Sequence, residues 1–150
     1  MTQPFRDKPW HKRFEVMGDI AEGEFAKRNP NAMPFGLNRP PWRVNEMPTD
    51  AMKCTPDFLL KDRFVEVMGL GRDQLLKLKR YKAQALFAIW DLVGPTNLWV
   101  WDSSRKVCWE AHISAWLDAC WTKGRVRHFP EGTEYHELAV ADFPEGSLQC

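Results

Sequence analysis

The chain has 150 residues, of which 44% are hydrophobic and 27% are charged. This length and balance are typical of a single globular domain, and they exclude a disordered chain. The formal net charge of +1 excludes a protein that binds nucleic acid through a large overall basic excess, so any such contact must come from a local cluster of basic residues.

The N-terminal residues, the lengths of the apolar runs and the cysteines indicate where in the cell the protein would act. Residues 1–17 are polar, charged and proline-bearing, and we expect them to form an N-terminal arm. No apolar run approaches the roughly 20 residues that span a bilayer, so the sequence predicts a cytoplasmic protein with no membrane partner. No CxxC pair is present, and we expect reduced thiols at all four cysteines: Cys54, Cys108, Cys120 and Cys150.

The N-terminal part of the domain is expected to begin with a helix. Within residues 18–27, Ile20, Ala21 and Phe25 fall on one stripe at helical spacing, provided that Gly23 is tolerated inside the helix. The following residues, 29–43, are rich in proline and show no regular period, which is typical of a loop. A strand is expected over 42–47.

A β-hairpin is the clearest local prediction. Two apolar runs, 55–60 and 63–68, flank the short polar break Lys61-Asp62. Two apolar runs separated by such a break are typical of antiparallel strands joined by a tight turn.

The second half alternates helices and strands. Residues 72–92 lack Gly and Pro and are rich in Leu, Lys, Ala and Gln, which predicts a long helix that Gly94-Pro95 ends. The apolar run 97–101 predicts a central strand covered on both faces. A further helix is expected over 109–121 and a short strand over 125–129.

The order of these elements defines a fold class. Helix, three strands, helix, strand, helix and strand predict an α/β fold in which one mixed β-sheet is flanked by helices. Residues 18–130 would form this domain, and the acidic residues 131–150 would follow as a C-terminal tail. The eight Trp residues are interpreted mainly as core residues rather than as surfaces that stack on bases.

The hairpin carries the residues with the strongest chemical signal. If its arms pair as expected, Asp57 and Glu66 lie close together on adjacent strands, away from the turn. Two neighbouring carboxylates repel each other unless a cation lies between them, and carboxylates on rigid strands suit Mg²⁺. Mg²⁺ would lower the pKa of a bound water and neutralise charge on a phosphate, as hydrolysis of a phosphodiester requires.

The hairpin also resembles a known family. Thr55-Pro-Asp-Phe-Leu-Leu and Phe64-Val-Glu-Val-Met-Gly-Leu are similar to the core of the phage endonuclease I type of Holliday-junction resolvase, within the PD-(D/E)xK nuclease superfamily. The resemblance covers residues 18–92 and is strongest over 55–71. It implies a restriction-endonuclease-like core of order αβββαβ, here with an extra C-terminal helix and strand. It also implies a metal-dependent DNA endonuclease that acts in DNA recombination.

The family adds a third acidic ligand from the first helix. Here that position is Glu22 or Glu24, and Glu22 is preferred because Phe25 follows it at the family's spacing and would face the sheet. The resemblance therefore implies that Glu22, Asp57 and Glu66 hold Mg²⁺, with Mn²⁺ as a substitute.

One position departs from the family pattern. The family's lysine is replaced by Met68, whose thioether cannot donate a proton or carry charge. Some relatives supply the lysine from the following helix, where Lys77 is the leading candidate for the catalytic group and Lys82 the second.

The same segment holds most of the local positive charge. Residues 72–82 contain one Asp and five basic residues, which are expected to contact the DNA backbone: Arg72, Lys77, Lys79, Arg80 and Lys82. No base-reading motif is visible, so we expect selectivity for DNA shape.

Three hypotheses follow. The first is an Mg²⁺-dependent endonuclease of branched DNA, which a phage would encode and which would act in the bacterial cytoplasm, with a homodimer as the form that would cut two strands. The second is a catalytically impaired protein of the same fold that binds DNA or a protein partner, which Met68 favours. The third is a nuclease acting on linear duplex or single-stranded ends.

Overall fold

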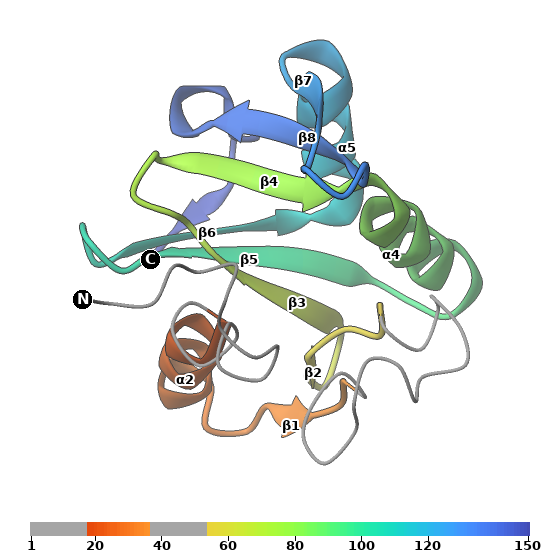
Figure 1. The fold of residues 1–150 in the computed structure, drawn as a ribbon. Coiled ribbons are helices and arrows are strands. Elements are labelled where there is room, and N and C mark those ends of the chain that lie inside the picture. Colours follow the sequence, from red (N-terminus) through yellow and green to blue (C-terminus); the bar gives the residue numbers. More distant parts are fainter. Residues whose placement is uncertain (1–17, 37–53) are drawn as a thin grey trace.

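The computed structural model describes residues 18–36 and 54–150, which form a mixed α/β structure (Figure 1). The expected N-terminal arm and the expected strand over 42–47 lie outside these residues. Within them, two β-sheets are accompanied by three α-helices, namely α2 (Gly18–Arg28), α4 (Arg80–Leu92) and α5 (Ile113–Thr122). None of the helices in the described ranges is both long enough and apolar enough to cross a membrane.

The larger sheet is mixed, as the sequence predicts. Its neighbouring strands are antiparallel except for the central pair β3 and β5, which run parallel. In spatial order the strands are β1 (Met33–Pro34), β2 (Phe58–Leu59), β3 (Phe64–Gly69), β5 (Thr96–Asp102), β6 (Val107–His112) and β9 (Leu148–Gln149). Strand β5 is buried along nearly its whole length, which confirms the prediction of a central, doubly covered strand.

The predicted hairpin is present. Strands β2 and β3 are antiparallel, with Phe58 opposite Val65 and Leu59 opposite Phe64. The polar residues Lys61 and Asp62 form the turn and are exposed. The local sequence pattern is therefore sufficient to specify this part of the fold.

A second sheet of three strands corrects the prediction of one long helix over 72–92. Residues Leu75–Lys79 form strand β4, which pairs with β8 (Glu134–Ala139), and β8 pairs with β7 (Arg125–His128). Only the second part of the predicted helix is helical, as α4. The pattern Leu-Leu-Lys-Leu-Lys alternates with period two and buries Leu76 and Leu78, so pairing with β8 overrides the helix-forming composition.

The C-terminal third contributes more to the sheets than expected. The helix predicted over 109–121 begins only at Ile113, because 109–112 belong to β6 and pair with β5. The predicted strand over 125–129 is present as β7. Residues 131–150, expected as a tail, instead supply β8 to the small sheet and β9 to the edge of the large one.

Two hydrophobic cores lie on opposite faces of the large sheet. Helix α2 covers one face, where Ala21 and Phe25 pack with Phe58, Val65 and Trp99. Ile20, expected on the same stripe, is instead 48% exposed. The other face is covered by α4, α5 and the small sheet (Figure 1). Four tryptophans fill these cores, as predicted, namely Trp99, Trp101, Trp109 and Trp116. Trp121 is an exception, because it is 69% exposed.

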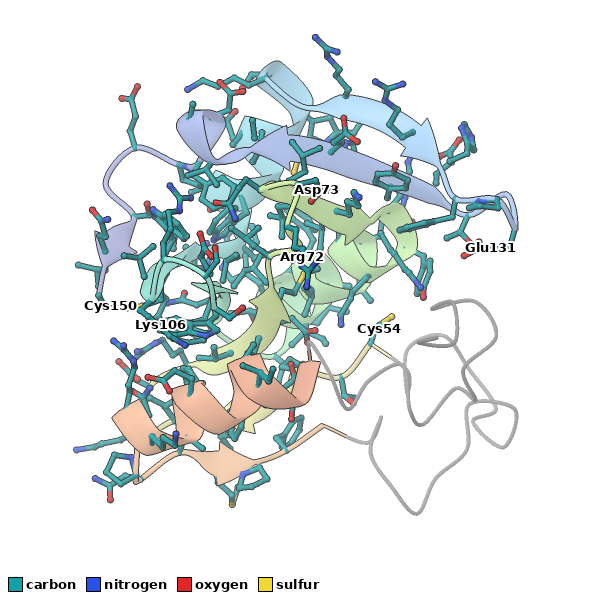
Figure 2. The ribbon with its side chains drawn as sticks, turned by 60° about the vertical axis from the view of Figure 1, so that its left-hand side comes forward. Cys54, Arg72, Asp73, Lys106, Glu131 and Cys150 are labelled. Carbon is teal, nitrogen blue, oxygen red and sulfur yellow. A yellow bond between two sulfur atoms is a disulfide. The ribbon has the colours of Figure 1, made fainter. Side chains whose placement is uncertain are left out.

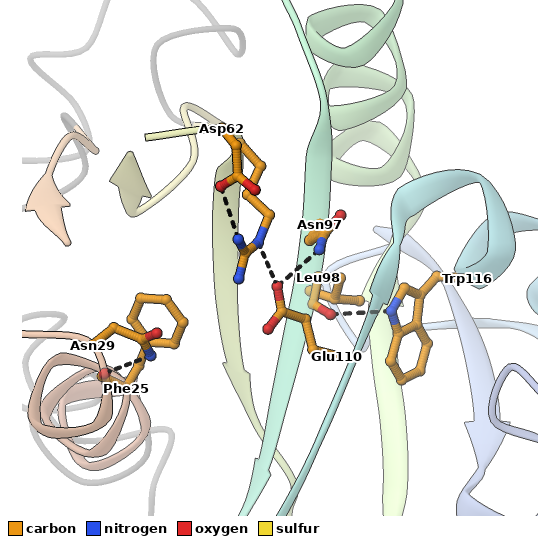
Figure 3. Close-up of polar contacts among 8 residues, drawn as sticks. Phe25, Asn29, Asp62, Asn97, Leu98, Glu110 and Trp116 are labelled. Carbon is orange, nitrogen blue, oxygen red and sulfur yellow. Dashed lines mark hydrogen bonds and ion pairs between the residues drawn. The ribbon is translucent and has the colours of Figure 1, made fainter. Parts of the chain in front are cut away.

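Polar contacts fix the hairpin to the sheet centre. Glu110 on β6 accepts hydrogen bonds from Arg63 Nε at 2.8 Å and from Asn97 Nδ2 at 2.8 Å (Figure 3). On the opposite side of β5, Trp116 Nε1 donates to the Leu98 carbonyl at 3.1 Å. Because Arg63 is held by Glu110 and Asp62, it does not pair with Glu66.

The cysteines differ from the expectation of four reduced thiols. Cys108 on β6 and Cys150 form a disulfide with a Cα–Cα distance of 5.2 Å. Their backbones also pair, through hydrogen bonds of 3.2 and 3.3 Å. This pairing joins residues 42 positions apart, so local spacing did not indicate it. Cys54 and Cys120 are buried free thiols.

Candidate active site

The alternation of β3 places one acidic side chain in the interior. Val65 and Val67 pack in the core beneath α2, whereas Met68 packs against the core on the other face. Because successive strand residues point to opposite faces, Glu66 lies on the same face as Met68, toward α4. Its side chain is only 1% exposed.

The hairpin brings Asp57 next to Glu66. Asp57 immediately precedes β2, and continuing the observed register by one residue places it opposite Glu66. Residues directly opposite each other in an antiparallel pair share a face. Asp57 Oδ2 accepts a hydrogen bond from the backbone N–H of Val67 at 2.8 Å, which fixes its carboxylate against β3. The two predicted carboxylates are therefore neighbours.

Lys82 in the first turn of α4 completes this cluster. Its ammonium group contacts Oε1 of Glu66, and its side chain is 24% exposed. Burial by itself would lower the pKa of Lys82, but the negative charges of Glu66 and Asp57 outweigh burial and raise it. Lys82 is therefore protonated throughout the ordinary pH range.

Glu66 has the opposite electrostatic balance. Burial, followed by the nearby charge of Asp57, raises the pKa of Glu66 to about 8, although Lys82 opposes the rise and Glu22 adds to it. Within the part of the chain that the structure describes, its Oε2 atom accepts no hydrogen bond. A buried carboxylate with one unpartnered oxygen is costly unless it binds a proton or a cation.

The structure distinguishes between the two candidate glutamates on α2. Glu24 accepts a hydrogen bond from Arg28 Nε at 3.0 Å, and this bond lowers the pKa of Glu24 on an exposed face. Glu22 instead lies near enough to Glu66 to raise its pKa. Asp57, Glu66 and Lys82 are thus brought together, Glu22 is the glutamate of α2 whose charge reaches Glu66, and Glu24 is directed elsewhere.

Lys77, the leading lysine candidate, lies outside this cluster. It is on β4 opposite Glu137, and its ammonium group pairs with Asp73. That contact raises the pKa of Lys77 and lowers the pKa of Asp73. The lysine beside the carboxylates is Lys82, the second candidate.

The five basic residues predicted to bind DNA do not share one helical face. Arg72 is exposed in the loop before β4, near Asp73 (Figure 2). Lys77 and Lys79 are on β4, and Arg80 Nη1 donates to Glu134 Oε2 at 2.6 Å. Lys82 contacts Glu66. The expected helical stripe is replaced by a strand followed by a helix.

A second buried carboxylate, that of Asp102, differs from Glu66 in its hydrogen bonds. Asp102 at the end of β5 is also 1% exposed, but both of its oxygens accept hydrogen bonds from the turn formed by Ser104 and Arg105. Despite burial, these bonds lower the pKa of Asp102. Asp102 therefore stabilises a turn, whereas Glu66 lacks comparable hydrogen bonds.

The cluster suits a divalent cation by its chemistry. Across the described ranges, no three His, Cys, Asp or Glu side chains are already arranged as a metal centre. However, the carboxyl groups of Glu66 and Asp57 carry hard oxygen atoms of the kind that Mg²⁺ binds, and the charge of Glu22 reaches Glu66.

Cys54 is a neighbour of the site that the sequence did not indicate. Its thiol is 1% exposed and interacts electrostatically with both Lys79 and Lys82. No local motif marks it, because its proximity depends on how the segment before β2 meets α4.

Comparison with known proteins found no matching family model, curated protein or solved structure.

Proposed function

We propose that this chain is a metal-dependent deoxyribonuclease with a restriction-endonuclease-like core. The observation that carries the proposal is the buried Glu66 carboxylate, which has Lys82 at one oxygen, an unpartnered second oxygen and Asp57 across the hairpin. A pKa strongly raised by burial and neighbouring charge is typical of functional sites.

Each residue has a separate role in this proposal. Glu66 and Asp57 from the hairpin and Glu22 from α2 hold Mg²⁺ or Mn²⁺ through carboxylate oxygens. The bound ion supplies acidity to a coordinated water and neutralises charge on the phosphate. Lys82 keeps its proton at Nζ beside the carboxylates, where its positive charge stabilises negative charge on the reacting phosphate oxygens.

The order of the elements supports the core assignment. Helix α2, the β2–β3 hairpin, α4 and β5 follow one another as expected, although β4 joins the small sheet rather than the large one. Selectivity for branched DNA and a homodimer that cuts two strands are parts of the proposal that rest on the resemblance of the hairpin. Action in the cytoplasm rests on the lack of a long apolar run, and it requires the protein to work there with the Cys108–Cys150 disulfide reduced or protected from reduction.

The alternative is a nuclease-like fold that binds DNA or a protein partner without cutting. Met68 favours this alternative, because the family's lysine is missing from β3. Lys82 favours the nuclease, because it brings an ammonium group from α4 into contact with Glu66.

The test compares cleavage of a labelled four-way junction and a duplex by the wild type, Asp57→Asn and Glu66→Gln in Mg²⁺ or Mn²⁺. We expect each variant to cut at least about 100-fold more slowly, because each lacks a metal ligand. Asp62→Asn is the matched control, since Asp62 is an exposed acid on the same hairpin. Binding of the junction by the wild type with no incision in either metal would favour the alternative.

Metal binding has a readout that does not depend on activity. At a Mg²⁺ concentration of about ten times Kd, ligand binding should stabilise the wild type by about 1.4 kcal/mol, or about 3 to 6 °C in Tm. Glu66→Gln should show no such shift, and Asp62→Asn should retain it. Equal shifts in all three proteins would contradict a metal site at Glu66.

A further inference from the structure

The outer face of the small sheet gathers basic side chains from two strands. Leu76 and Leu78 of β4, and His136 and Leu138 of β8, point into the core. The alternate residues therefore point outward, in two cross-strand rows. The rows are Lys79, Tyr135 and Arg127, and Lys77, Glu137 and Arg125.

The positive charges on this face are only partly neutralised. Lys77 pairs with Asp73, and Arg127 Nε lies 3.7 Å from Glu137 Oε1. Neither Lys79 nor Arg125 forms an ion pair with any residue in the described ranges. Against the four cations stand Asp73, Glu137 and Glu131, whose charge acts on Lys79, so the face keeps a local positive excess that attracts a polyanion.

Aromatic rings lie among these charges. The rings of Phe129 and Tyr135 are 4.2 Å apart between centroids, and both side chains are partly exposed. The Lys79 ammonium lies 5.6 Å from the Phe129 ring and 5.8 Å from the Tyr81 ring. Basic side chains interleaved with aromatic rings are the arrangement by which proteins hold unpaired nucleic acid, because bases stack on the rings while cations contact phosphates.

This face is continuous with the candidate active site. Strand β4 leads directly into α4, so Lys79 precedes Lys82 by three residues (Figure 1). Burial lowers the pKa of Lys79, and the charge of Lys82 lowers it further, so the two ammonium groups lie within electrostatic range of each other. A chain of phosphates passing Lys82 would meet Lys79 next.

We propose that the outer face of the β4, β8 and β7 strands binds an unpaired stretch of the DNA strand that enters the active site. Arg125, Arg127 and Lys79 contact its phosphates, and Tyr135 stacks on a base. The assignment of this strand as substrate rests on the proposed function, but binding by the face does not require cleavage. Stacking requires exposed base faces, so a single strand fits better than a duplex.

The test measures binding of a fluorescein-labelled oligothymidylate in EDTA, where no metal-dependent cleavage occurs, by fluorescence anisotropy over a range of salt. Arg125→Ala/Arg127→Ala should weaken binding about tenfold or more and reduce the slope of log K against log salt by about 1.4, which corresponds to two phosphate contacts. The matched control, Lys27→Ala/Lys61→Ala, removes two exposed lysines outside this face and should bind like the wild type.

The aromatic contact has its own pair of variants. Tyr135→Ala should weaken binding at least about fivefold with an unchanged salt slope, and Tyr135→Phe should restore it, because stacking needs only the ring. Duplex of the same length should bind more weakly and be insensitive to Tyr135→Ala. Unchanged binding in the double arginine variant, or equal loss in its lysine control, would overturn the proposal. Absence of cleavage with these binding results intact would instead contradict the proposed nuclease.

Discussion

Two acid–lysine pairs lie on either side of the junction between β4 and α4. They differ in how far water reaches them. Asp73 and Lys77 are 42% and 37% exposed, so water screens their charges. Glu66 and Lys82 are 1% and 24% exposed, and Glu66 has no other described hydrogen-bond partner. An exposed pair contributes about 0 to 1 kcal/mol, whereas a buried carboxylate carries a desolvation penalty that a single partner offsets only in part.

The comparison shows that the direction in which a lysine points from its strand or helix decides what it contacts. Lys77 and Lys82 are five residues apart and are chemically identical, yet only Lys82 faces the carboxylates of β3. A costly buried charge is difficult to explain by stability alone, because an apolar side chain would serve the core better. The unequal environments therefore point to function at Glu66 and Lys82, and to an ordinary surface contact at Asp73 and Lys77.

The largest expected effect comes from replacing the buried lysine. Lys82→Met should reduce cleavage of the junction by about 100- to 10,000-fold, because the ammonium group beside the reacting phosphate is lost. Single-turnover cleavage rates, with circular dichroism to confirm folding, provide the measurement. Lys77→Met is the matched control: at saturating protein concentration, where weaker DNA binding does not limit the rate, it should cut within about twofold of the wild type. Comparable losses in both variants would remove the distinction between the pairs.

The two acids should respond to pH with opposite signs. The pKa of Glu66 is raised from its ordinary value of 4.5 to about 8 in the folded protein, so between these pH values the folded state binds more protons than the unfolded state. Its contribution to stability is therefore lost as pH rises toward 8, by on the order of 5 kcal/mol in EDTA. The pKa of Asp73 is lowered, so its smaller contribution is lost as pH falls.

Urea unfolding at several pH values measures both trends. Glu66→Gln should flatten the decline between pH 5 and about 8, whereas Asp73→Asn should leave this decline unchanged. A decline that persists in Glu66→Gln would mean that another group carries it.

Introducing a lysine at position 68 on β3 should have a moderate effect, which we expect to be a loss of stability rather than a gain of activity. Met68 packs against the core on the face toward α4, so Met68→Lys should destabilise the protein by about 1 to 2 kcal/mol. Cleavage should not rise, because Lys82 already supplies an ammonium group. A clear rise in rate at unchanged metal affinity would show that Lys82 is an inadequate substitute.

The smallest effect is expected at the surface pair. Lys77→Ala should change the free energy of unfolding by no more than about 0.5 kcal/mol, because an exposed ion pair is screened by water and salt. Thermal unfolding at low and high salt measures it. A loss above about 1.5 kcal/mol would show that the Asp73 contact is structural.

The sequence predicts correctly those elements that neighbouring residues determine. The hairpin was predicted because two apolar runs and a short polar break fix its register, and that register alone brings Asp57 to Glu66. Strand β4 was missed because its leucines and lysines are good helix formers, although they alternate with the period of a strand. A single helix over 72–92 would favour Lys77 as the lysine of the site. The helix begins only at Arg80, however, and this start turns Lys82 toward β3.

Contacts between segments that are far apart in the sequence could not be predicted from local patterns. The strand character of residues 109–112 depends on pairing with β5, and the disulfide depends on β9 returning to β6. Neither depends on neighbouring residues, so composition and periodicity carry no signal for them.

The short strand β9 has a practical consequence for handling the protein. It covers part of the outer edge of β6, and the Cys108–Cys150 bond secures it there. In a solution containing dithiothreitol, only a few backbone hydrogen bonds would retain β9. Its release would uncover N–H and C=O groups on which strands of other molecules can assemble. Precipitation of reduced samples would then reflect edge-to-edge association between folded molecules.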